Sequence, residues 1–170
     1  MKKLSKNLKG FTLIELLIVI AIIAILAGVV YVALDPLTRF KDARDSNRWS
    51  DTSALLSAIK VNQVDNGGAY LAAIAAMTPG EVYMITGDGT TTGCNAQNAN
   101  CDVAVTDTGN CVNLNGLVTA GYIGKVPVSP NGEGAWTSSI TGYTLTASST
   151  GIITITACES ENTTAIQVIR

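Results

Sequence analysis

The sequence contains no histidine, the side chain that most often serves as a general base near neutral pH. This absence excludes serine–histidine triads and most zinc-hydrolase sites. The short glycine motif at residues 87–89 lacks the lysine of a phosphate-binding loop. Aromatic residues make up only 5% of the chain and are scattered, so no stacking platform is predicted. We therefore assign no catalytic residue and no cofactor, and we do not expect an enzyme.

Basic residues are few, and they are unevenly placed. The chain has 11 lysines and arginines against 13 acidic residues, and four of the lysines precede Phe11: Lys2, Lys3, Lys6 and Lys9. Removing residues 1–10 leaves seven basic and 13 acidic side chains, a net charge of −6. Binding to nucleic acid needs clustered basic side chains that displace counterions from phosphates. No nucleic-acid partner is therefore predicted for the body of the protein.

The longest uninterrupted pattern is an apolar run of 19 residues, 16–34, that carries no charge. As a helix it is about 28 Å long, close to the thickness of a bilayer core. It is longer than the apolar region of an ordinary secretory signal. Gly28 inside the run and Pro36 after it are the two weak points of an otherwise continuous helix.

Residues 10–15 read GFTLIE, and the apolar run follows at once. This combination resembles the N-terminal signature of type IV pilins and the related pseudopilins. The resemblance implies that a membrane aspartyl peptidase cuts between Gly10 and Phe11 and that Phe11 becomes the methylated N-terminus. It also divides the chain into a prepilin leader (1–10), a transmembrane and filament-core helix (11–35) and a globular domain (36–170) that includes the C-terminal half of the long helix.

Glu15 is a charged residue that directly precedes the apolar run. An ionised carboxylate costs about 2.5–3.5 kcal/mol at mid-bilayer and less near the interface, so it needs compensation. Cleavage after Gly10 would create an ammonium at Phe11, four positions away on the same helical face. The family resemblance implies instead that Glu15 pairs with the N-terminal ammonium of a neighbouring subunit and serves assembly. The plainer alternative is an interfacial glutamate that has no partner.

The charges that flank the run do not set its orientation, because four lysines precede it and four basic residues follow it: Arg39, Lys41, Arg44 and Arg48. The acid-free N-terminal flank and the cysteines of the body favour a cytoplasmic N-terminus. We therefore expect a single-pass protein of the cytoplasmic membrane whose globular domain lies outside the cytoplasm and later forms part of an extracellular filament.

All four cysteines lie beyond the membrane segment: Cys94, Cys101, Cys111 and Cys158. An even number in an exported domain indicates two disulfides. Metal binding or free thiols are the alternatives, but the spacings are not those of zinc ligands. Of the three pairings, we favour Cys94–Cys101, which would close a short loop, with Cys111–Cys158.

The rest of the sequence predicts an α+β fold, in which a long helix packs its amphipathic C-terminal half on a small antiparallel β-sheet, as in pilins. Asp35 and Pro36 can start a new helical segment, which ends at residues 66–68. The expected apolar stripe of that segment consists of Phe40, Ala43, Asn47, Ala54, Ala58 and Ile59. Strands are predicted at residues 81–86, 143–147, 153–157 and 164–169, with a short helix in 69–80 and a long loop at 87–116.

Three weaker signals lie in the body of the protein. Asp88, Asp102 and Asp107 could bind calcium, although their spacing matches no known calcium loop, so no metal site is assigned. Asn162 begins an Asn-Thr-Thr glycosylation sequon. Glu159 and Glu161 are expected on the solvated surface rather than in a catalytic pair.

The favoured function is that of a structural subunit, a prepilin that assembles into an extracellular filament by helix packing. By resemblance, its partners are other copies of the chain, the prepilin peptidase, and the pilus assembly platform and ATPase. One alternative is a pseudopilin of a type II secretion or competence DNA-uptake machine. Such pseudopilins usually have a shorter body and a calcium loop. The other alternative is a membrane-anchored binding module.

Overall fold

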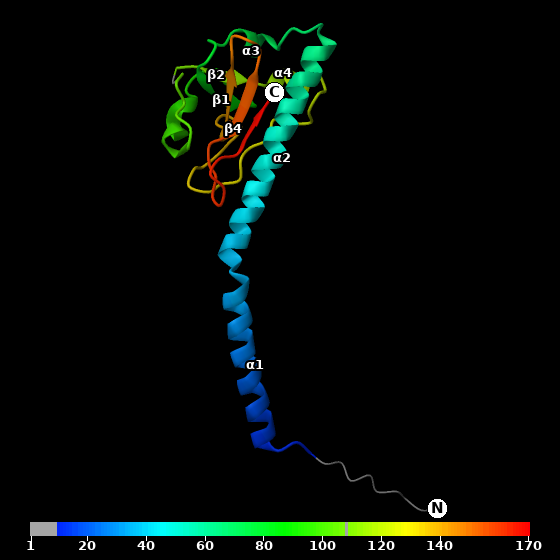
Figure 1. Ribbon diagram of the computed structural model, residues 1–170, viewed down its shortest axis with the longest axis vertical. Helices are drawn as coiled ribbons and strands as arrows, with labels where there is room; N and C mark the ends of the chain where they lie inside the picture. Colours follow the sequence, from blue (N-terminus) through cyan, green and yellow to red (C-terminus); the bar gives the residue numbers. More distant parts are fainter. Residues whose placement is uncertain (1–9, 108) are drawn as a thin grey trace, which may run out of the picture. The chain divides into compact units, whose positions relative to one another are not determined.

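The computed structural model describes residues 10–107 and 109–170, so residues 1–9 of the predicted leader lie outside the described residues. The chain divides into two compact units, one that extends to Arg39 and one from Phe40 to Arg170. Figure 1 shows the long helical segment of the N-terminal part and the mixed α/β body that follows it in sequence. We describe each unit by itself.

Helix α1 (Leu13–Leu34) contains the apolar run, and every one of its residues is exposed. Thr12 is the N-cap residue of this helix. Among the described residues there is one helical segment that is long and apolar enough to cross a membrane, and its apolar part is α1. An apolar helix without a buried face gains nothing from contact with water, so α1 needs lipid or other helices around it.

The predicted break at Asp35 is confirmed. Asp35 has a positive φ of 38°, and helix α2 (Pro36–Asp65) begins at the next residue. A residue before proline is sterically disfavoured in the α conformation, and aspartate tolerates the left-handed region better than most side chains. The Thr38 hydroxyl donates to Asp35 Oδ2 at 2.6 Å. The chain therefore leaves the helix for one residue and starts again with proline in the first helical position.

The predicted end of the second helical segment is also confirmed. The amides of Gly67 and Gly68 donate to the carbonyls of Val64 and Gln63, at 3.2 and 2.8 Å. Both glycines have positive φ angles, 65° and 96°, which side chains other than glycine rarely adopt. The helix consequently stops at Asp65.

The second unit contains a five-stranded sheet in the order β2-β1-β3-β4-β5 (Figure 1). Strands β1, β3, β4 and β5 are antiparallel neighbours, as predicted, whereas β2 pairs in parallel with β1. The strands are β1 (Val82–Thr86), β2 (Cys111–Asn113), β3 (Tyr143–Ala147), β4 (Ile153–Ala157) and β5 (Gln167–Ile169). The shorter elements are α3 (Ala72–Ala75), η1 (Cys94–Asn100) and α4 (Asn115–Thr119). Strand β2 and η1 lie in the segment predicted as a loop, so that prediction was wrong for these residues.

The main core lies between one face of the sheet and α2. Leu55 and Ile59 of the helix pack in the same cluster as Leu145 of β3 and Ile155 of β4, which pair with each other across the two strands. A smaller cluster covers the opposite side of β1, where Met84 is buried with Trp136 and the cysteines. The fold is therefore α+β with a long N-terminal helical segment, as the sequence predicted.

The predicted apolar stripe on α2 was partly wrong. Ala58 and Ile59 are buried, but Phe40, Ala43, Asn47 and Ala54 are exposed. The first half of the buried face carries polar side chains instead. They are Asp45, Arg48 and Thr52. An apolar periodicity could not find this face, because its contacts with the body are ionic.

The cysteines form two disulfides, as predicted, but the favoured pairing was wrong. The bonds are Cys94–Cys111 and Cys101–Cys158. The first joins the start of η1 to β2, and the second joins the end of η1 to the residue after β4. The segment just before Cys94 pairs with the start of β2: Thr92 bridges Asn110, and the Cys111 amide donates to the Thr91 carbonyl at 2.9 Å, which brings Cys111 to Cys94.

This pairing can be tested by digestion without reduction. The chain has no lysine or arginine between Lys60 and Lys125, but a protease that cuts before aspartate yields peptides 88–101 and 107–170. Cys94 and Cys101 lie in the first peptide, and the other two cysteines lie in the second. We expect the two peptides to stay joined until a reductant is added, as mass spectrometry would show.

The rejected pairing would place each disulfide inside one peptide, so the peptides would separate without reduction. Fragmentation of peptide 88–101 between its two cysteines distinguishes the remaining arrangement, in which Cys94 would pair with Cys158. Linkage of Cys94 to any residue other than Cys111 would contradict the structure.

Candidate functional site

The first candidate site is the start of α1. Gly10 and Phe11 precede the helix in irregular backbone, and the Phe11 side chain is 88% exposed. The backbone amide and the hydroxyl of Thr12 both donate to Glu15 Oε2 at 2.8 Å. The Glu15 amide donates in return to the Thr12 hydroxyl at 3.3 Å. This reciprocal arrangement is a capping box, and it satisfies two backbone amides at the helix start.

The two residues of the predicted cleavage site, Gly10 and Phe11, lie outside the helix and are exposed. Glu15 is exposed as well, so its carboxylate can be reached by a second molecule. The sequence singled out Gly10, Phe11 and Glu15 but missed Thr12. The pattern Thr-x-x-Glu before an apolar run was the signal that could have found it.

The second candidate site is a buried ion cluster around Arg48, whose side chain is fully buried. Arg48 Nη1 donates to Asp45 Oδ1 and Glu161 Oε1, each at 2.8 Å. Its Nη2 donates to Glu159 Oε2 at 2.8 Å and to the Pro130 carbonyl at 3.1 Å. The fifth donor, Nε, meets the Ser129 hydroxyl at 3.1 Å. All five N–H groups of the guanidinium are therefore used, as a buried cation requires.

The carboxylates around Arg48 are themselves saturated. Asp45 accepts hydrogen bonds from the backbone amides of Glu161 and Asn162, and Glu159 accepts one from the amide of Gly134. Arg44 adds a two-point contact with Glu161, in which its Nε donates at 2.7 Å. Three carboxylates thus share two guanidinium groups. The cluster ties α2 to the loop before β3 and to the segment after β4.

Glu161 and Glu159 were expected on the solvated surface, and this prediction was wrong. Glu159 is 5% exposed, and Glu161 is half-buried. The hydrogen bonds from Arg44, together with those from Arg48, lower the pKa of Glu161 to about 2. The arginine partners of both glutamates lie more than 100 residues away in the chain, so no local pattern could have revealed them.

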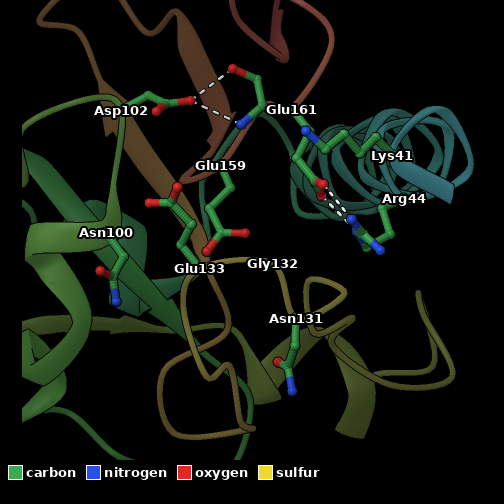
Figure 2. Close-up of a pocket in the computed structure, with 10 residues that line it drawn as sticks. Lys41, Arg44, Asn100, Asp102, Asn131, Gly132, Glu133, Glu159 and Glu161 are labelled. Carbon is green, nitrogen blue, oxygen red and sulfur yellow. Dashed lines mark hydrogen bonds and ion pairs between the residues drawn. The ribbon is translucent and has the colours of Figure 1, made fainter. Parts of the chain in front are cut away.

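A polar cavity of about 440 Å³ lies beside this cluster. Figure 2 shows Lys41 and Arg44 on α2 across the cavity from Asn100 and Asp102. The amide and hydroxyl of Ser160 donate to Asp102 at 2.9 and 2.7 Å, and these bonds form one wall. The cavity is lined by charged and amide side chains, together with Ser160 and Gly132. Two pairs of lining residues bind each other, Arg44 with Glu161 and Asp102 with Ser160.

The three loop aspartates that could have bound calcium are not brought together. Asp88 accepts hydrogen bonds from Ser139 and Thr90, which lower the pKa of Asp88 to about 2. Asp102 binds Ser160, and Asp107 accepts from the amide of Asn110 at 2.9 Å. Among the described residues, no group of three histidine, cysteine or acidic side chains could hold a metal ion. Each aspartate instead closes a turn or a loop contact.

The comparisons with known proteins concern the first site. The family model described as the prokaryotic N-terminal methylation motif matches residues 5–31. This motif is the signature of type IV pilins and pseudopilins, so the chain carries the N-terminal signature of that family. In that family the motif in general implies a structural subunit, homo-oligomeric assembly and processing by a prepilin peptidase. No curated protein and no solved structure matches the chain.

The Arg48 cluster is expected to stabilise the folded protein, and substitution of Arg48 tests this. Replacing Arg48 by methionine leaves three buried or half-buried carboxylates without their shared cation, so we expect a loss of about 3–5 kcal/mol in the free energy of unfolding. Arg48→Lys keeps the charge but not the five donors and should fall between Arg48→Met and the wild type. Lys41→Met, an exposed change on the same helix, is the matched control. Chemical unfolding of the oxidised protein, followed by the fluorescence of buried Trp136, measures all three. Equal stability of Arg48→Met and Lys41→Met would contradict the role of the cluster.

The low pKa of Glu161 predicts how the stability of the folded protein depends on pH. Its pKa is about 2 in the folded protein against an ordinary value of 4.5. The stabilisation is therefore complete above pH 4.5 and is lost as the pH falls toward 2. We expect the wild type to lose stability in this interval more steeply than Glu161→Gln, with Glu133→Gln as a control for the loss of one charge. Parallel stability curves for the wild type and Glu161→Gln would rule out this linkage.

Proposed function

We propose that the chain is the structural subunit of a type IV pilus-like extracellular filament. In this proposal it is made as a prepilin, cut between Gly10 and Phe11, methylated on Phe11, and assembled by packing of α1 helices from many copies. The observation that carries the proposal is an acidic residue, Glu15, inside the methylation motif at the start of a fully exposed apolar helix. A plain anchor has no need of that carboxylate, whereas a helix that must meet the N-terminus of another copy does.

The body supports an extracytoplasmic location. Two disulfides join four cysteines, and such bonds persist in oxidising compartments. In the proposal, α1 first lies in the cytoplasmic membrane with the N-terminus inside. The same exposed surface of α1 would then exchange lipid for neighbouring helices in the filament core. A prepilin peptidase, an assembly platform and an ATPase are the partners that this route requires.

A pseudopilin of a secretion or DNA-uptake machine remains the second candidate, because the methylation motif is common to both groups. The long disulfide-bonded segment between β1 and β3 and the lack of a metal cluster among the described residues favour the pilus. Deleting the gene in its own host separates the two functions. Loss of surface filaments with normal protein secretion supports a pilus, whereas loss of secretion alone supports a pseudopilin.

The proposed processing and assembly have a direct test. Filaments sheared from cells are examined by negative stain, and the N-terminus of their subunit is determined by mass spectrometry. We expect filaments whose subunit begins with a methylated Phe11. Glu15→Ala should still insert and be cut but should lose filaments at least about ten-fold, because the helix then carries no charge for a neighbour's ammonium. Glu133→Ala, at an exposed carboxyl of the second unit, is the control.

Two results would count against this function. One is a wild-type strain that forms no filaments and whose protein has any N-terminus other than methylated Phe11. The other is a Glu15→Ala protein that assembles normally. The second result would support an ordinary membrane anchor that presents a binding module.

A further inference from the structure

Three asparagines of the chain are followed directly by glycine: Asn66, Asn115 and Asn131. In such a pair the backbone nitrogen of the glycine can attack the side-chain carbonyl carbon of the asparagine, because glycine has no Cβ to shield its own nitrogen. The reaction requires that the two groups be free to meet in the folded protein. The structure treats the three pairs differently in this respect.

Two of the pairs are held apart by their surroundings. At the end of α2, the Asn66 side chain donates to the Asn62 carbonyl at 2.8 Å, and the Gly67 amide donates to the Val64 carbonyl at 3.2 Å. The attacking nitrogen and the leaving amide of this pair are therefore both engaged.

The pair Asn115–Gly116 opens helix α4, and helical side chains point back toward the N-terminus, away from the next amide. Gly116 is also closely packed, since a Cβ there would lie 2.8 Å from Leu71 Cδ1. The backbone of this pair has little room to turn into the attacking conformation.

The pair Asn131–Gly132 is free. Both residues are exposed and lie in irregular backbone in the loop before β3. Within residues 10–107 and 109–170, neither the Gly132 amide nor the Asn131 side-chain nitrogen meets a hydrogen-bond acceptor. Both residues also line the polar cavity beside the Arg48 cluster, so water reaches them (Figure 2). The attacking nitrogen and the leaving amide are thus both available.

The carbonyl of Asn131 is in addition polarised. The backbone amide of Trp136 donates to Asn131 Oδ1 at 3.0 Å. Trp136 is itself buried, so this donor is held in place. Attack on the side-chain carbon moves negative charge onto Oδ1, and a fixed donor at that oxygen lowers the barrier to the attack. The corresponding oxygens of Asn66 and Asn115 accept no such bond from the described residues.

We propose that Asn131–Gly132 is a site of self-modification, at which Asn131 deamidates through a succinimide. The Gly132 nitrogen forms a bond to the side-chain carbon of Asn131 and gives up its proton to water. The side-chain nitrogen takes up a proton and leaves as ammonia. A water molecule then opens the ring at either of its two carbonyls, which yields aspartate or isoaspartate at position 131. The modification concerns the body alone and does not depend on the proposed filament.

The product bears directly on the Arg48 cluster. Isoaspartate adds one methylene to the backbone between positions 131 and 132. Gly132 has no space for added volume, because a Cβ there would collide with Glu159 Oε2 and lie 3.1 Å from Arg48 Nη2. The neighbouring Pro130 carbonyl and Gly134 amide also bind Arg48 and Glu159. The modification should therefore displace the loop from the cluster and weaken it.

The rates at the three asparagines test the site. The full chain, oxidised and held in detergent micelles, is aged at mildly alkaline pH and then reduced and digested. Cleavage after lysine, arginine and glutamate places the three pairs in separate peptides, 61–81, 82–125 and 126–133. By mass spectrometry with fragmentation, we expect Asn131 to be modified at least about ten-fold faster than Asn66 or Asn115. The reduced chain, aged in denaturant, should modify all three at similar rates, and an aliquot that is not aged corrects for the digestion.

A second measurement tests the effect on the cluster. Deamidation adds one negative charge, so ion exchange separates modified from unmodified protein within one aged sample. The fraction that carries isoaspartate at position 131 should unfold at a lower denaturant concentration than the unmodified fraction. Asn131→Gln is the matched control, because glutamine keeps the amide but closes a ring far more slowly. After the same ageing it should show no loss of stability.

Either of two results overturns the proposal. If Asn131 in the folded protein is modified no faster than Asn66 and Asn115, the loop is not a site of self-modification. If the fraction with isoaspartate unfolds at the same denaturant concentration as the unmodified protein, the modification does not act on the Arg48 cluster.

Discussion

The body of this protein depends on one guanidinium group. Arg48 lies on the buried face of α2, and it meets the carboxylate of Asp45 on the same helix. Its other partners, two carboxylates, one carbonyl and one hydroxyl, come from segments that are distant in sequence. Burial of a cation is costly unless every donor is used, and here every donor is used. The contacts of the cluster are therefore expected to form or break together. The loop before β3 and the segment after β4 are fixed to the helix together.

The two halves of the α2 surface that faces the body make different kinds of contact. Around Leu55 and Ile59 the contact is apolar and tolerant of small shifts. Around Arg48 it is ionic and requires a defined geometry. An apolar core alone would permit the helix to slide by small steps along the sheet. The ion cluster removes that freedom and fixes the register of α2 against β3 and β4.

The sequence predicted those parts of the structure that have local causes. The apolar run, the Asp35–Pro36 break, the Gly67–Gly68 stop and the antiparallel strands each follow from residues within a few positions of one another. The Arg48 cluster, the parallel strand β2 and the disulfide pairing depend on contacts between residues far apart, and periodicity carries no information about them. The candidate site at the start of α1 is local in sequence: Gly10, Phe11 and Glu15 were singled out from the sequence, and Thr12 was missed although its spacing to Glu15 was visible.

The order of the cysteines has a consequence for how the body responds to a cut in its backbone. The two bonds interleave, since Cys101 lies between Cys94 and Cys111 whereas its partner, Cys158, lies beyond both. A single cut of the backbone anywhere between residues 94 and 158 leaves the two pieces covalently connected. A protease that cuts one exposed loop in this region therefore releases no fragment. The backbone of the body can be cut once in this region while the two pieces remain covalently joined.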